Sequence, residues 1–132
     1  MSLALSGNLV LVGAGKMGGA MLEGWLKSGA NPAKIVAFDP APPAEVKAML
    51  EVNSVRLNPK IADITDAEVI IVAVKPQVMN DAIKPLAESI RLNSKSSPLV
   101  VSIAAGIRIA RLEQSLPKET RVIRVMPNTP CL

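Results

Sequence analysis

The chain has 132 residues, the size of one ordinary domain, and 49% of them are hydrophobic. Only 2% are aromatic and the net charge of +4 is spread along the chain, which argues against stacking on single-stranded nucleic acid and against a basic binding patch. A single cysteine and the lack of histidine exclude an internal disulfide framework and a zinc site within these residues.

Apolar segments with strand character alternate with segments of helical character. The expected strands are Asn8–Val12, Lys34–Phe38, a weak Val55–Leu57, Val69–Val74, Leu99–Ile103 and Arg121–Val125. The expected helices are Lys16–Ser28, Pro43–Val52, Val78–Arg91 and Ile109–Ser115, with Gly29 ending the first. This alternation predicts an α/β fold of the Rossmann type, with a doubly wound, mainly parallel sheet and helices on both faces.

A glycine-rich turn, Gly13-Ala14-Gly15-Lys16-Met17-Gly18, directly follows the first strand. Gly13 permits a tight turn, Gly15 lets the backbone approach a pyrophosphate, and Gly18 allows the helix to pack on the strand. The motif alone is weak, and its simplest alternative is a turn needed only for packing. Its place between a strand and a helix, with Asp39 about twenty residues later, predicts a dinucleotide site. A P-loop is excluded, because Met17 stands where Ser or Thr is required.

Asp39 follows the second strand, where a carboxylate is expected to accept hydrogen bonds from the ribose hydroxyls of the adenosine half. It would repel a 2′-phosphate and Pro40 supplies no guanidinium, so the pair favours NAD over NADP. The alternative is an ordinary aspartate in a turn before proline. Lys16 has two open interpretations, a phosphate contact or an exposed lysine on the first helical turn.

Three later segments join a strand end to a turn of small residues or proline: Ala73-Val74-Lys75-Pro76-Gln77, Ser102-Ile103-Ala104-Ala105-Gly106 and Arg124-Val125-Met126-Pro127-Asn128-Thr129-Pro130. Each alone has a simple structural explanation. Taken in order, G-x-G-x-M-G, A-V-K-P-Q, S-I-A-A-G-I and V-R-V-M-P-N-T-P closely resemble pyrroline-5-carboxylate reductase, and the resemblance runs from Asn8 onward. That family reduces 1-pyrroline-5-carboxylate, a cyclic imine, to L-proline by hydride transfer from NAD(P)H, the last step of proline biosynthesis.

The resemblance implies a set of cofactor-binding residues at the ends of the strands. They are Val12, Gly13, Ala14, Gly15, Lys16, Met17, Gly18, Asp39, Ala73, Val74, Lys75, Pro76, Ala104, Ala105 and Gly106. Asn128 and Thr129 would lie near the reacting centre. The chain departs from the family in two places: NADPH-preferring members tend to carry a small polar or basic residue at Asp39-Pro40, and some have a cofactor-contacting asparagine near Ile61. The cofactor is therefore NADP(H), as often in the family, or NAD(H), as Asp39 favours.

Family members continue past M-P-N-T-P into a helical domain that supplies dimerisation and holds the imine. We therefore expect residues 1–125 to form the NAD(P)-binding domain and 126–132 to begin a linker to a C-terminal domain outside this chain. Histidine and tyrosine are absent, so no catalytic residue is assigned, and the chain alone is expected to be inactive. The full-length protein would be a homo-oligomer.

Two alternative functions remain: another small NAD(P)-dependent reductase of the β-hydroxyacid dehydrogenase-like group, and a non-enzymatic dinucleotide-sensing module. No apolar run is long enough to span a membrane, and the first cationic side chain is Lys16, so there is no basic start of a signal peptide. The expected location is the cytoplasm, the expected ligands are the dinucleotide and a small imine, and no metal, nucleic acid or membrane is expected as a partner.

Overall fold

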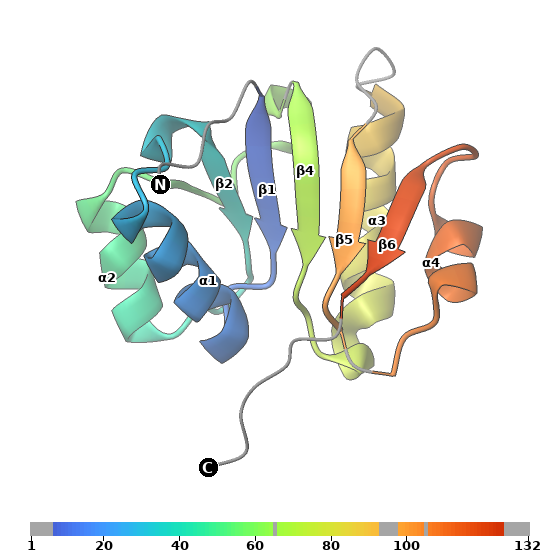
Figure 1. The fold of residues 1–132 in the computed structure, drawn as a ribbon, viewed down its shortest axis with the longest axis horizontal. Helices are drawn as coiled ribbons and strands as arrows, with labels where there is room; N and C mark the ends of the chain where they lie inside the picture. Colours follow the sequence, from blue (N-terminus) through green and yellow to red (C-terminus); the bar gives the residue numbers. More distant parts are fainter. Residues whose placement is uncertain (1–6, 65, 93–97, 105, 126–132) are drawn as a thin grey trace.

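The structure is a computed structural model that describes residues 7–64, 66–92, 98–104 and 106–125. One six-stranded sheet with the order β3-β2-β1-β4-β5-β6 forms its centre (Figure 1). The strands are β1 (Asn8–Val12), β2 (Ile35–Phe38), β3 (Arg56–Leu57), β4 (Ala67–Val72), β5 (Leu99–Ser102) and β6 (Arg121–Arg124). All five pairings are parallel, and this strand order is that of doubly wound α/β folds. The predicted fold class is confirmed.

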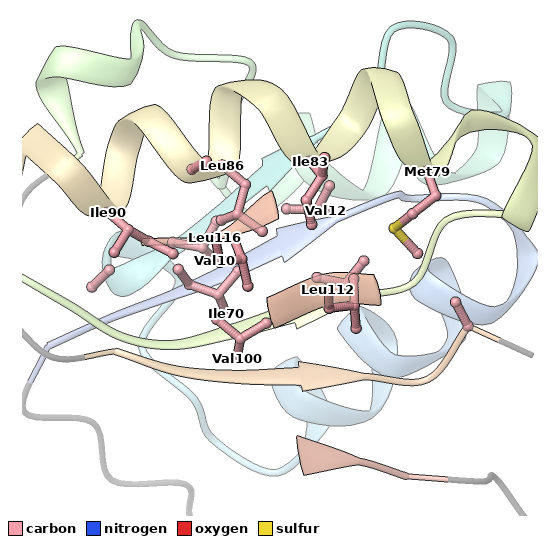
Figure 2. Packing of buried hydrophobic residues seen from close by; sticks show 14 of the residues in the cluster. Val10, Val12, Ile70, Met79, Ile83, Leu86, Ile90, Val100, Leu112 and Leu116 are labelled. Carbon is pink, nitrogen blue, oxygen red and sulfur yellow. The ribbon is translucent and has the colours of Figure 1, made fainter. Parts of the chain in front are cut away.

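Helices cover both faces of the sheet, and consecutive residues of each strand point to opposite faces. On one face, Leu9 and Leu11 of β1 pack with α1 (Lys16–Lys27) and α2 (Ala44–Val52), which bury Leu22 and Leu50. The other face carries α3 (Met79–Leu92) and α4 (Ile109–Ser115). Figure 2 shows this second core, in which side chains of β1, β4 and β5 meet those of α3, of α4 and of the residue that caps α4: Val10, Val12, Ile70, Val100, Met79, Ile83, Leu86, Ile90, Leu112 and Leu116.

Several predicted boundaries were wrong by one or two residues. The strand predicted at Val69–Val74 is β4 at Ala67–Val72, because the apolar run continues beyond the point where the chain leaves the sheet. The strands predicted to end at Ile103 and Val125 end one residue earlier, although the amides of both residues still donate to Val72 and Ser102.

The observed ends of the helices also differ from the predicted ones. Val78 belongs to a 3₁₀ turn, η3 (Pro76–Val78), so α3 begins at Met79 and runs to Leu92. Two further 3₁₀ turns, η1 (Pro32–Lys34) and η2 (Ile61–Asp63), precede β2 and β4, so the strand predicted from Lys34 begins at Ile35. Pro43 is the N-cap of α2, Ser28 the C-cap of α1, and the weak third strand is Arg56–Leu57. Gly29 ends α1 as predicted, with a φ of 92°.

No helix within the described ranges is both long and apolar enough to cross a membrane.

Candidate functional site

A cavity of about 640 Å³ opens beside the carboxyl ends of β1, β2 and β4. Its walls come from the β1–α1 turn, the loops after β2 and β3, the segment after β4 and one side of α3. Ligands of open α/β sheets bind at this edge, where the strand order reverses between β1 and β4. The cavity is therefore the first candidate for a functional site.

The glycines of the β1–α1 turn have different structural roles. Gly13 has a φ of +99°, and a Cβ added there would lie 2.9 Å from the carbonyl carbon of Ala73. At Gly18 an added Cβ would lie 2.1 Å from the carbonyl oxygen of Gly13, so α1 packs directly on the turn. At Gly15, by contrast, nothing lies within 4 Å of the Cβ position, and Gly15 lines the cavity. Gly13 and Gly18 are required by packing, whereas Gly15 leaves open space at the cavity.

The N-terminus of α1 is open toward an anion. Gly15 is its N-cap without a side-chain hydrogen bond, and the first turn contains no acidic residue. The Gly19 amide donates to the Gly15 carbonyl over 2.7 Å. The amides of residues 16–18 come before this hydrogen bond and have no acceptor within the helix. These amides and the helix dipole favour a phosphate. The side chains of Lys16 and Met17 are exposed.

Asp39 joins the loop after β2 to the glycine turn. Its Oδ2 accepts a hydrogen bond from the Ala14 amide over 2.8 Å, and its Oδ1 accepts one from the Ala41 amide over 2.8 Å. The residue lines the cavity. Each carboxylate oxygen has a second lone pair, so Asp39 can still accept hydrogen bonds from ligand hydroxyls.

Asn58 is a cavity residue that sequence reasoning missed. Its Nδ2 donates to the Asp39 carbonyl over 2.8 Å, and its Oδ1 accepts from the Asp39 amide over 2.9 Å. The only signal in the sequence is the dipeptide Asn58-Pro59, which is typical of a turn. An asparagine was expected to be missing near Ile61, but the structure places Asn58 in the same wall of the cavity as Ile61.

The end of the cavity against α3 is a mostly apolar slot, with Asp81 and Ser89 as the polar residues that α3 contributes to the lining. Phe38 and Ile61 face it together with residues of η3 and α3, namely Val78, Ala82, Pro85 and Leu86. A slot of this kind fits a flat, weakly polar ring. The cavity thus combines a carboxylate that can accept hydroxyl groups with a mostly apolar slot, and at Gly15 it meets the N-terminus of α1. Within the described part of the chain, no cluster of three or more potential metal-ligating side chains exists.

The structure brings seven of the predicted site residues together in the cavity wall: Val12, Gly13, Gly15, Asp39, Ala73, Val74 and Lys75. Ala14 and Gly18 are buried behind the turn, and Pro76 starts η3 beside the cavity. Ala104, which is buried, and Gly106, which is exposed, are not part of the wall. Ala105, Asn128 and Thr129 lie outside the described residues.

Comparison with known proteins gives a matching family model and relatives that share one name. A family model described as NADP oxidoreductase coenzyme F420-dependent matches residues 8–106. The pyrroline-5-carboxylate reductase of Vibrio alginolyticus is 35% identical over 122 residues, covering 92% of this chain and 43% of that protein. The enzyme of the same name from Methanosarcina acetivorans is 38% identical over 120 residues, covering 89% of this chain and 42% of the relative. The chain therefore spans less than half the length of these relatives.

Solved structures agree with the fold. A pyrroline-5-carboxylate reductase from Coxiella burnetii superimposes with a TM-score of 0.72 at 25% identity, over 96% of this chain and 46% of that one. The pyrroline carboxylate reductase of Plasmodium falciparum, solved with NADP bound, gives a TM-score of 0.70 at 22% identity, over 96% of this chain and 44% of that one.

Proposed function

Because the chain belongs to the family described as NADP oxidoreductase coenzyme F420-dependent, we propose that it is the cofactor-binding domain of a pyrroline-5-carboxylate reductase. The whole protein reduces 1-pyrroline-5-carboxylate to L-proline with a hydride from NAD(P)H, in proline biosynthesis. One observation carries the proposal: Gly15 leaves open space where the cavity meets the free N-terminus of α1.

The residues of the cavity fit the parts of a dinucleotide. The amides at the start of α1 hold the pyrophosphate, and Asp39 accepts hydrogen bonds from the adenosine ribose. The apolar slot beside Phe38 and Ile61 receives the adenine. Residues 73–76 run along the nicotinamide ribose, and residues 104–106 lie near the ring. When bound, the reduced nicotinamide supplies the hydride, and this domain supplies its position.

The preferred cofactor is NAD(H) in this proposal. Asp39 is held in the cavity wall by two amides, so its negative charge stays where a 2′-phosphate would lie. Pro40 also lines the cavity and offers no positive charge to offset it. A carboxylate at this place favours a free 2′-hydroxyl.

The remainder of the protein completes the enzyme. Residues 1–125 form the cofactor-binding domain, and residues 126–132, with Asn128 and Thr129 near the reacting centre, lead into a C-terminal helical domain. That domain holds the imine and makes the protein a homo-oligomer, and the protein works in the cytoplasm. The chain by itself then binds cofactor without forming proline. Measurable proline formation by the purified chain 1–132 contradicts the proposal that the C-terminal domain is needed for the reaction.

Calorimetric titration of the purified chain with NADH and NADPH tests the proposal, with Gly15→Val as the diagnostic variant. Gly24→Val is the matched control, because nothing lies within 4 Å of the Cβ position at either glycine and Gly24 is outside the cavity wall. We expect the wild type and Gly24→Val to bind alike and Gly15→Val to show no binding while remaining folded. Absence of binding by the wild type, or unchanged affinity of Gly15→Val, contradicts the proposed site.

A further inference from the structure

The edge of the sheet beside β2 is completed by a side chain. β3 contains only two residues, which pair with Val36 and Ala37 of β2. The Asn58 amide continues the ladder by donating to the Ala37 carbonyl over 2.8 Å. Its side-chain amide then pairs with both main-chain groups of Asp39, over 2.8 and 2.9 Å. Asn58 therefore replaces the strand residue that would otherwise hold the end of β2.

The backbone of Asn58 suits this role. Its φ is 51°, in the left-handed region that asparagine tolerates better than most residues. In this conformation the chain turns away from β2 after β3, while the side chain remains directed at Asp39. The two polar atoms of the side chain both hydrogen-bond to the main chain of Asp39, so Asn58 is placed to act through Asp39.

Asp39 transmits this restraint to the glycine turn. Its carboxylate accepts from the Ala14 amide, and the adjacent Gly13 amide donates to the Phe38 carbonyl over 2.8 Å. A continuous set of hydrogen bonds thus joins the loops after β3, β2 and β1, and all three loops line the cavity. The position of the Asp39 carboxylate therefore depends on the hydrogen bonds between Asn58 and the Asp39 main chain and on the one from the Ala14 amide to the carboxylate.

We propose that Asn58 is a positioning residue that fixes Asp39 and thereby sets the preference for a dinucleotide with a free 2′-hydroxyl over one with a 2′-phosphate. This inference rests on the proposed function. With the Asp39 main chain held, the carboxylate meets the ribose hydroxyls in one position and cannot turn away from a phosphate. Without Asn58, the ribose hydrogen bonds weaken and the repulsion of a 2′-phosphate is relieved.

Asn58→Gly is the first test, because glycine keeps the left-handed backbone and removes only the side chain. Ser54→Gly is the matched control, since Ser54 has a φ of 57°, is exposed and is not part of the cavity wall. We expect Asn58→Gly to weaken NADH binding about tenfold, the scale of one hydrogen bond to a charged group, and NADPH binding less. Ser54→Gly leaves both affinities unchanged. An unaltered ratio of the two affinities in Asn58→Gly overturns the inference.

A double-mutant cycle separates an indirect role from a direct contact. In an Asp39→Ala background, Asn58→Gly should cause no further loss of NADH affinity, because its effect passes through the Asp39 carboxylate. A full, additive tenfold loss shows that Asn58 acts directly on the ligand and refutes the positioning role. Should Asn58→Gly fail to fold in urea titrations, Asn58→Ser replaces it, since this chain already carries serine at a positive φ at Ser54.

The wild-type titration separates this inference from the proposed function. If the wild type binds neither dinucleotide, the proposed function fails and the role of Asn58 fails with it. If the wild type prefers NADH but Asn58→Gly keeps the same preference, only the inference about Asn58 fails. A wild-type preference for NADPH overturns the inference while leaving the cofactor-binding domain intact.

Discussion

The packing of α1 on the glycine turn makes Gly18→Ala the most informative stability variant. The added methyl would lie 2.1 Å from the carbonyl oxygen and 3.1 Å from the carbonyl carbon of Gly13, whereas ordinary contact begins at 3.4 Å. The obstacle is backbone, and its residue is held by the hydrogen bond from the Gly13 amide to Phe38. Helix α1 must therefore shift away from β1, which loosens the packing of the fully buried Leu22.

Overpacking of a rigid site costs about 1–3 kcal/mol, and occasionally more. Because the two atoms nearest to the added methyl belong to the Gly13 backbone, we expect a loss of about 3 kcal/mol at Gly18→Ala. Gly24→Ala in the same helix is the control, since nothing lies within 4 Å of its Cβ position and the residue is exposed. Alanine is the better helix former, so this control should gain about 0.5–1 kcal/mol.

Urea unfolding followed by the fluorescence of Trp25, the single tryptophan, measures both variants. Trp25 lies half-buried in α1 against the core, so it reports on the helix that Gly18→Ala displaces. With a slope of about 2 kcal/mol per molar urea, the midpoint should fall by about 1.5 M for Gly18→Ala. A midpoint equal to that of the wild type would show that α1 does not rest on the turn as the structure has it.

Three further variants test other parts of the molecule. Replacing Asp39 by Ser and Pro40 by Arg should shift the preference from NADH toward NADPH in calorimetric titrations, because a repelling carboxylate is lost and a guanidinium is gained. An unchanged ratio of the NADH and NADPH affinities would show that Asp39 lies away from the ribose. Leu22→Ala empties a site with no exposed surface and should cost about 2–5 kcal/mol in urea unfolding, so a loss well under 1 kcal/mol contradicts the packing. Glu23→Gln removes the exposed ion pair to Lys27 at 2.9 Å and should cost at most about 0.5 kcal/mol, so a larger shift of the midpoint contradicts a purely local role.

The sheet and its helices could be predicted from the sequence because the hydrophobic pattern and the alternation of elements agree. β1 was predicted with its observed bounds, since the apolar run ends at Gly13, where the chain must turn. β4 was placed two residues too late because Ala73 and Val74 are apolar but follow the last ladder pair. Hydrophobicity reports burial, and these two residues pack beside the cavity without belonging to the strand.

The site was only partly predictable for a related reason. Asp39 could be found because its distance from the glycine turn follows from the length of one β-α-β unit. Asn58 could not, because its partner lies 19 residues away and is reached only through the register of a two-residue strand. A short, weak strand leaves almost no pattern in the sequence, although it decides which side chain stands next to Asp39.

The hydrogen bond from Ala14 to Asp39 also changes how the glycine turn must meet a phosphate. From the resemblance to pyrroline-5-carboxylate reductase, residues 12–17 were expected to surround the pyrophosphate together. In the structure the Ala14 amide already donates to Asp39 Oδ2 over 2.8 Å, and Gly13 donates to Phe38. The donors that remain for an anion are those that begin α1, next to the open space at Gly15. Under the proposed function, the first half of the motif positions the carboxylate for the ribose, and the second half is left to bind the phosphates.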